Sequence, residues 1–256
     1  MNKIGFFGAG KMAQGILAAI EDRRAVLMAE RVAPVRAAVA EKFGVNVTDD
    51  LLAVARQCDL IFLAVRPADV DEVASVVRPV LKRGQTLVSI VAGKTLAKLR
   101  KAFGLKVKIV RVMPNLALRV GEGMCAITPA NAAVERVLGA AGRIVVLKEK
   151  AFDAVTALSG SGPAYFAYMQ KAMAAAGVRL GLKPSVAALL SAQTMYGTAK
   201  FLRENPMDID EFIAGVCTKG GTTAAGMAHL AKPPFARAVE KTLAAAAKRS
   251  AELAGA

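Results

Sequence analysis

The chain has 256 residues, enough for one or two domains with a sizeable core. Hydrophobic residues make up 55% and charged residues 21%, which excludes a disordered chain. The net charge is +15, but the basic residues are scattered and aromatic residues total only 5%, so no nucleic-acid stacking platform is expected.

The first 150 residues alternate short apolar runs with helical patterns. Strands are predicted at 3–7, 25–29, 45–47, 60–65, 86–91, 108–112, 124–128 and 144–147. Helices are predicted at 12–20, 34–43, 50–57, 70–77, 95–103 and 134–141. This alternation predicts an α/β domain with a mostly parallel, doubly wound sheet.

The strand signal ends near residue 150, and the rest of the chain has an alanine-rich helical pattern. Glycine or proline interrupts it at 159–163, 181–184, 205–206, 219–221 and 232–234. We therefore expect a first domain over 1–150 and an all-helical domain over 151–256. The Ala- and Met-rich faces exceed what one small helical domain can bury, which favours a dimer.

A glycine-rich turn follows the first predicted strand. Gly8, Gly10 and Ala13 form G-x-G-x-x-A at the start of a helix, the context of a Rossmann-type dinucleotide fingerprint. Gly8 would make the turn, Gly10 would admit the pyrophosphate, and Ala13 would let the helix approach the strand. The enclosed residues Ala9, Lys11 and Met12 belong to the same candidate cofactor site, with the helix N-terminus facing the phosphates.

Two charged residues end the second predicted strand and bear on the choice of cofactor. Glu30 lies 20 residues after Gly10, where an acid bonds ribose hydroxyls and repels a 2′-phosphate. Arg31 is adjacent and could pair with that phosphate. The sequence therefore predicts NADPH or NADH and leaves the choice open.

Further candidate cofactor residues lie at carboxyl ends of predicted strands, where open α/β sheets bind ligands. They are Ala64, Val65, Arg66, Pro67, Ala92, Gly93 and Asn115.

The helical half contains a second candidate site between two helical patterns. It places hydroxyl groups and flexible backbone before a helix that begins near Thr222, an arrangement suited to binding a carboxylate. The residues are Thr218, Gly220, Gly221, Thr222 and Thr223. The alternative is a helix cap made by Thr222 alone.

The histidine and cysteine content argues against metal chemistry. His229 is the single histidine and is expected to be structural or at the surface. The three cysteines form no C-x-x-C pair, which predicts a reducing compartment and no zinc site. With no evident targeting or membrane segment, we expect a cytoplasmic protein without a metal.

Taken together, these motifs resemble the pyrroline-5-carboxylate reductases. The stretches that carry the resemblance are 8–13, 64–67, 91–93, 111–115 (Arg-Val-Met-Pro-Asn), 158–165 (Leu-Ser-Gly-Ser-Gly-Pro-Ala-Tyr) and 220–223 (Gly-Gly-Thr-Thr).

The resemblance implies a Rossmann domain followed by a helical dimerisation domain, dimers that assemble into rings, and a cofactor that crosses the cleft between domains. It implies that 1-pyrroline-5-carboxylate binds at 218–223, with Thr223 near the imine nitrogen as the catalytic residue. Four departures bear on the cofactor and the substrate: Thr218-Lys219 replaces the usual Ser-Pro, Arg66 replaces a lysine, Glu30 replaces a polar residue, and an asparagine expected near Asp50 is absent.

Other functions remain open from the sequence. One is a reductase of another cyclic imine. Another is a β-hydroxyacid dehydrogenase, although Lys171 lies nine residues after Gly162 and lacks the expected asparagine. A dinucleotide-binding regulator would keep Gly8 and Gly10 but would not need the loop 218–223.

Overall fold

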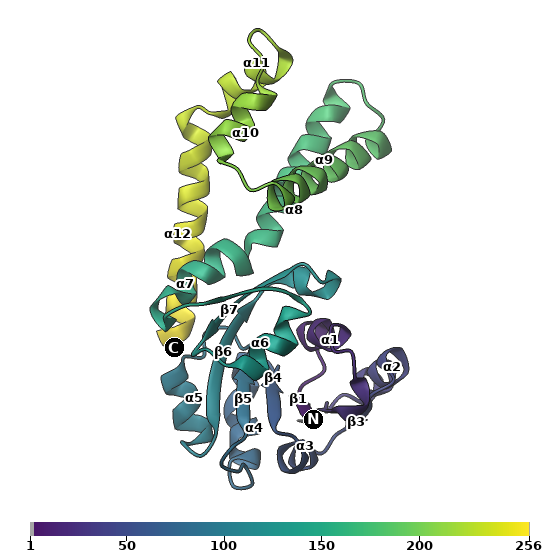
Figure 1. Cartoon of the computed structure of the whole chain (residues 1–256), viewed down its shortest axis with the longest axis vertical. Helices are drawn as coiled ribbons and strands as arrows, with labels where there is room; N and C mark the ends of the chain where they lie inside the picture. The colour runs from purple at the N-terminus through teal and green to yellow at the C-terminus, as the bar shows by residue number, and fades with distance from the viewer. Residues whose placement is uncertain (1–2, 256) are drawn as a thin grey trace. The chain divides into compact units, whose positions relative to one another are not determined.

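The structure is a computed structural model that describes residues 3–255 (Figure 1). Its internal contacts divide the chain into two compact units. The first contains the residues up to Ser161 together with those from Ala245 onward, and the second contains Gly162–Ala244. The end of the chain thus returns to the first unit.

The first unit is built on one eight-stranded sheet. Its strands are β1 (Ile4–Phe7), β2 (Val26–Ala29), β3 (Asn46–Thr48), β4 (Leu60–Leu63), β5 (Thr86–Ser89), β6 (Lys108–Pro114), β7 (Gly123–Thr128) and β8 (Gly142–Val146). They lie in the order β3-β2-β1-β4-β5-β6-β7-β8. All neighbouring pairs are parallel except β6 and β7. The predicted doubly wound, mostly parallel sheet is confirmed.

Helices follow the strands as the sequence predicts, with ends that shift by a few residues. They are α1 (Lys11–Ala18), α2 (Ala33–Phe43), α3 (Leu51–Gln57), α4 (Val70–Val77), α5 (Leu96–Phe103), α6 (Ala132–Gly139) and α7 (Phe152–Val155). The side chains of Asp50 and Thr95 accept hydrogen bonds from backbone N–H groups and cap α3 and α5. Short 3-10 turns lie at Arg23–Ala25, Pro67–Asp69, Leu116–Val120 and Glu149–Ala151.

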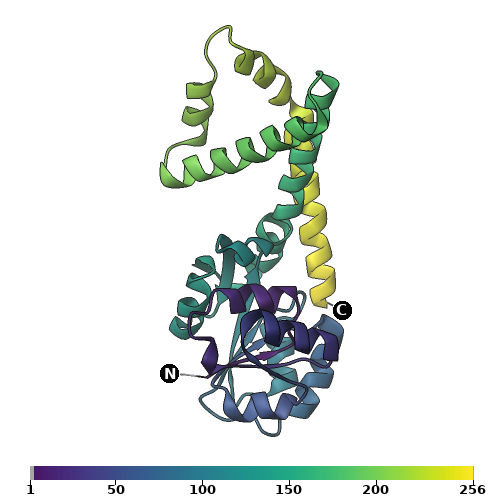
Figure 2. The ribbon, with the colours of Figure 1, turned by 90° about the vertical axis from the view of Figure 1, so that its right-hand side faces the viewer.

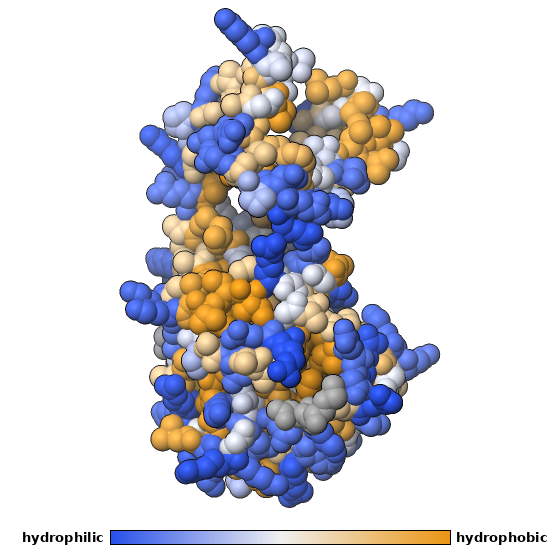
Figure 3. All heavy atoms as spheres, in the orientation of Figure 1, coloured by the Kyte–Doolittle hydropathy of each residue, from blue (hydrophilic) through white to orange (hydrophobic). Residues whose placement is uncertain are grey.

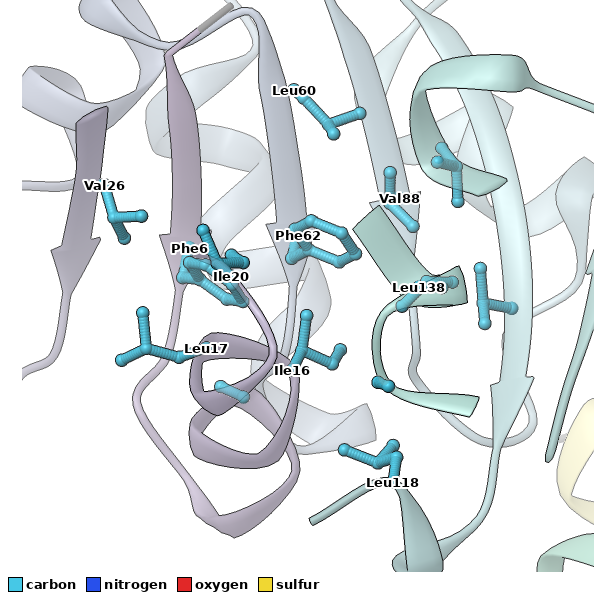
Figure 4. Packing of buried hydrophobic residues seen from close by; sticks show 14 of the residues in the cluster. Phe6, Ile16, Leu17, Ile20, Val26, Leu60, Phe62, Val88, Leu118 and Leu138 are labelled. Carbon is cyan, nitrogen blue, oxygen red and sulfur yellow. The ribbon is translucent and has the colours of Figure 1, made fainter. Parts of the chain in front are cut away.

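The two faces of the sheet bury separate hydrophobic clusters because successive side chains of a strand point to opposite faces. Phe6 belongs to one cluster and Phe7 to the other, and both are fully buried. Phe6 stacks on Phe62 with the ring centroids 5.0 Å apart. Figure 4 shows this pair next to Ile16 and Leu17 of α1. The packing fixes the turn between β1 and α1.

The second unit contains only helices, shown from the side in Figure 2. They are α8 (Gly162–Arg179), α9 (Pro184–Glu204), α10 (Ile209–Val216), α11 (Thr222–Leu230) and the first half of α12 (Pro233–Gly255). Close packing joins α8 and α9, since a Cβ on Gly177 would lie 3.3 Å from Ala187 Cβ. None of the helices between residues 3 and 255 is long and apolar enough to cross a membrane.

The predicted interruption at 159–163 is confirmed at Ser161, a bend between a π-helical turn, Thr156–Gly160, and the start of α8 at Gly162. Ser161 N–H donates to the Thr156 carbonyl (2.8 Å). Neither Gly160 nor Gly162 has a positive φ, so the interruption does not use a left-handed glycine.

Many large hydrophobic side chains of the second unit are exposed in the single chain, as the orange areas over its helices show (Figure 3). Phe166, Tyr168, Leu189 and Tyr196 are each at least 60% exposed. A high proportion of exposed large apolar side chains is typical of a protein–protein interface.

Candidate functional site

The turn between β1 and α1 needs a glycine at its first position. Gly8 has φ +95°, and its N–H donates to the Ala29 carbonyl (2.7 Å). A Cβ at Gly8 would lie 2.6 Å from the Ala64 carbonyl oxygen. Gly8 therefore allows β1 to turn tightly beside the end of β4.

Gly10 has a different role from Gly8. It is the N-cap of α1 with φ −67°, and a Cβ there would meet no protein atom within 4 Å. No side chain caps this helix N-terminus. The first-turn N–H groups are thus left for a ligand, and the space beside Gly10 fits a pyrophosphate. The residues therefore fit the dinucleotide that the motif predicts.

A crevice of about 530 Å³ lies beside this turn. It brings together seven of the predicted cofactor residues: Gly8, Gly10, Glu30, Arg31, Ala64, Val65 and Arg66. Ala9 is fully buried beneath it, and Lys11 and Met12 form the first turn of α1. Pro67 opens the 3-10 turn that follows Arg66. These residues come from three neighbouring strand ends, as the sequence predicts.

Sequence reasoning missed four polar or charged contributors to this crevice or its rim. Asp49, Asp69 and Glu72 line it, and Arg36 forms an ion pair with Asp49 (3.3 Å). The spacing of Arg66 and Asp69, three residues apart in a turn, was the one signal that could have indicated an interaction.

Glu30 is held by the backbone around it. Ala9 N–H donates to Glu30 Oε2 and Val32 N–H donates to Oε1, each at 3.0 Å. The carboxylate thus ties the end of β2 to the glycine-rich turn. It also keeps a negative charge at the edge of the crevice.

Both arginines of the crevice interact with Asp69. Arg66 donates from Nε to Asp69 Oδ2 (2.8 Å) and from Nη2 to Oδ1 (3.0 Å), a bidentate pair. Arg31 Nη2 lies 3.7 Å from Asp69 Oδ1. The hydrogen bond from Arg66 holds the pKa of Asp69 below its ordinary value, and the same contact raises the pKa of Arg66.

Three predicted cofactor residues, Ala92, Gly93 and Asn115, lie outside this crevice, past the ends of β5 and β6. Gly93 has φ +72°, and a Cβ there would lie 3.0 Å from the Leu253 carbonyl oxygen. Asn115 accepts a hydrogen bond from Met124 N–H (3.1 Å). Gly93 is therefore needed for close packing against Leu253, and the Asn115 side chain binds the backbone of β7.

The second candidate site, at 218–223, lies wholly in the helical unit. Gly221 N–H donates to the Thr218 carbonyl (2.9 Å), and Gly220 has φ +75° at this tight turn. The positive φ makes a glycine the favoured residue at position 220, whereas a Cβ on Gly221 would overlap Thr218 Oγ1 and require that side chain to shift.

The capping alternative for Thr222 is wrong. Gly221 is the N-cap of α11, Thr222 is the first helical residue, and no side chain caps the helix. Thr218, Thr222 and Thr223 are all exposed. The loop thus offers hydroxyl groups and uncapped N–H groups together, a combination that can bind a carboxylate.

The single histidine and the cysteines lie outside both candidate sites. His229 is exposed in the last turn of α11. Between residues 3 and 255, no group of three or more His, Cys, Asp or Glu side chains could hold a metal ion. Burial raises the pKa of the Cys58 and Cys125 thiols to about 11, which makes them poor nucleophiles.

Comparisons with known proteins agree with this architecture. Residues 149–253 match the family model described as pyrroline-5-carboxylate reductase dimerisation, and residues 3–93 match that of NADP oxidoreductase, coenzyme F420-dependent. A pyrroline-5-carboxylate reductase from Arabidopsis thaliana is 36% identical over 98% of this chain and 95% of its own length.

Two solved structures are similar over nearly the whole chain. A pyrroline-5-carboxylate reductase from Coxiella burnetii has a TM-score of 0.92 at 28% identity and covers 98% of both chains. A pyrroline carboxylate reductase from Plasmodium falciparum with NADP bound has a TM-score of 0.86 at 29% identity, covering 99% of this chain and 98% of its own.

The sheet order and the glycine-rich turn define a Rossmann-type, dinucleotide-binding protein with an appended helical domain. The sequence similarity narrows this class further, because it extends over both parts of the chain. The chain belongs to the pyrroline-5-carboxylate reductase family.

Proposed function

We propose that this chain reduces 1-pyrroline-5-carboxylate to L-proline with NADPH or NADH. The observation that carries the proposal is the 36% identity to the Arabidopsis reductase over 98% of the chain. The uncapped helix N-terminus at Gly10 supports the cofactor part, and the hydroxyl-bearing loop at 218–223 supports the substrate part.

The cofactor would be held by the crevice of the first unit. Backbone N–H groups at the start of α1 would bind the pyrophosphate, with Gly10 giving the space. Glu30 and Arg31 would face the adenosine ribose, and Ala64, Val65 and Arg66 after β4 would contact the remainder. Ala92, Gly93 and Asn115, which lie outside this crevice, stay proposed cofactor residues on the resemblance alone. When bound, the reduced nicotinamide supplies the hydride that converts the imine to an amine.

The substrate would be held by the loop at 218–223. Backbone N–H groups of Gly221 and Thr222 would bind the ring carboxylate, assisted by the hydroxyl groups of Thr218 and Thr222. Thr223 would orient the imine nitrogen through its hydroxyl. A protonated imine is already an electrophile, so these residues would act by positioning it.

We propose that the domains are 1–150 for the dinucleotide and 151–256 for substrate binding and dimerisation. The match of 149–253 to the dimerisation family model and the exposed apolar side chains of the helical unit support a homodimer. A ring of dimers and a cytoplasmic location, with no nucleic-acid or membrane partner, are further proposals. The odd number of cysteines supports the cytoplasm.

The test is a substrate panel. We expect 1-pyrroline-5-carboxylate to drive oxidation of NADH or NADPH with one proline formed per cofactor. Cyclic imines without the carboxylate should be poor substrates, and β-hydroxyacids with NAD⁺ or NADP⁺ should be inert. Turnover of a β-hydroxyacid in place of the imine would contradict the proposal.

The role of Thr223 is tested separately. Thr223→Ala should lower kcat by about ten- to a hundredfold, because one hydrogen bond to a charged group contributes about 1.5–3 kcal/mol. Thr242→Ala is the matched control, since Thr242 Oγ1 donates to the Ala238 carbonyl of its own helix. Full turnover by Thr223→Ala would remove this residue from the site.

A further inference from the structure

The crevice beside Gly10 is acidic, although the chain as a whole carries a net charge of +15. Its lining includes four carboxylates, Glu30, Asp49, Asp69 and Glu72, and two guanidinium groups, Arg31 and Arg66. Arg36 balances Asp49 from outside the lining. A dianionic group that enters here therefore meets more carboxylates than cations.

The two guanidinium groups converge on one carboxylate. Asp69 binds Arg66 through both oxygens, at 2.8 and 3.0 Å, and lies 3.7 Å from Arg31. The Asp69 side chain is only 18% exposed, against 61% for Arg31 and 71% for Arg66. Asp69 is thus the inner member of the cluster and sets where both cations lie.

The remaining groups do not offset this arrangement. Glu72 Oε2 lies 4.0 Å from Arg31 Nη1, a second acidic partner for the same guanidinium. Glu30 is fixed by two backbone N–H groups and cannot swing away without losing both bonds. A 2′-phosphate would have to compete with Asp69 for each arginine while facing Glu30.

We propose that Asp69 makes this crevice select NADH over NADPH, because it engages the two arginines that a 2′-phosphate would require. The inference rests on the proposed function, since it assumes that a nicotinamide dinucleotide binds here. Ribose hydroxyls have no charge and can donate to Glu30, so NADH binds without displacing Asp69. Asp69 is therefore a specificity-determining residue that the glycine-rich motif does not contain.

The test is calorimetric measurement of Kd for NADH and NADPH, which needs no turnover. We expect the wild-type chain to bind NADH at least about tenfold more tightly, the equivalent of one charge-assisted hydrogen bond. Asp69→Asn removes the negative charge that holds both guanidinium groups and should lower this preference by about tenfold or more. Asp71→Asn removes the same charge outside the crevice, where Asp71 pairs with Lys94, and should leave it unchanged.

Two further measurements test whether Arg31, Arg66 and charge repulsion determine the preference. In the Asp69→Asn background, Arg31→Gln with Arg66→Gln should abolish the gain in NADPH affinity. In the wild-type chain, rising salt should reduce the NADH preference, because salt screens repulsion between exposed charges; this measurement needs no variant to fold.

The dinucleotide affinities can also contradict the inference. Equal or tighter binding of NADPH by the wild-type chain would overturn this inference and leave the proposed function intact. The same holds if Asp69→Asn changes the preference no more than Asp71→Asn does. Failure to bind either dinucleotide would overturn both the inference and the cofactor part of the proposed function.

Discussion

Replacing Gly10 by valine should weaken dinucleotide binding while leaving the fold intact. The backbone at Gly10 has φ −67° and ψ 176°, which any L-residue adopts. A Cβ there meets no protein atom within 4 Å. The added side chain therefore points into space that only a ligand would occupy.

The magnitude follows from the contacts at the start of α1. Displacing the pyrophosphate from one or two backbone N–H groups should cost about 1.5–3 kcal/mol each, so Kd should rise by at least about tenfold. The cost to folding should stay below about 1 kcal/mol, because the glycine is an N-cap whose replacement affects only a helix end.

Gly8→Ala is the informative comparison. Gly8 has φ +95°, and its added Cβ would lie 2.6 Å from the Ala64 carbonyl oxygen. It should lower the free energy of unfolding by about 1–3 kcal/mol. Fluorescence titration with NADH and thermal melting should thus separate the two glycines. Native NADH affinity in Gly10→Val would refute the assignment of the crevice.

Other parts of the first unit give further predictions. Arg111 is 3% exposed and forms an ion pair with Glu149 (2.9 Å). Glu149→Ala leaves this buried charge unpaired and should lower the free energy of unfolding by about 2–4 kcal/mol, measured with denaturant. An unchanged denaturation midpoint would contradict this. Gly142→Ala would place a Cβ on the Gly123 backbone. This should lower the free energy of unfolding by about 1–3 kcal/mol and the Tm by several degrees. The pKa values of Cys58 and Cys125, raised to about 11, lie far above pH 8, so native protein should show one fast-reacting thiol and unfolded protein three.

The elements of the α/β unit were predictable because their signals are local. Helix α4 has the predicted bounds, Val70–Val77, and the buried strand β4 follows from a run of apolar residues. The interruption at 159–163 was predictable from its glycines and proline. The π-helical turn Thr156–Gly160 just before it was not, because the periodicity of the side chains gave no sign of it.

In the candidate site, too, some residues could be predicted from the sequence and others could not. The glycine-rich turn and the charged residue after β2 were found because their spacing is fixed by the strand–turn–helix geometry. Asp69 was missed because its importance depends on the approach of Arg31, which is distant in sequence. The sequence indicated a cofactor role for Gly93 but could not indicate its close contact with Leu253, because Leu253 lies near the other end of the chain.

The central claim is that the chain transfers a hydride to 1-pyrroline-5-carboxylate. The most direct measurement uses NADH labelled with deuterium at both C4 positions of the nicotinamide, followed by mass spectrometry and NMR of the product. We expect proline with a single deuterium at the ring carbon that was the imine carbon. Cofactor oxidation without labelled proline, or transfer of the label to a different acceptor only, would contradict the account.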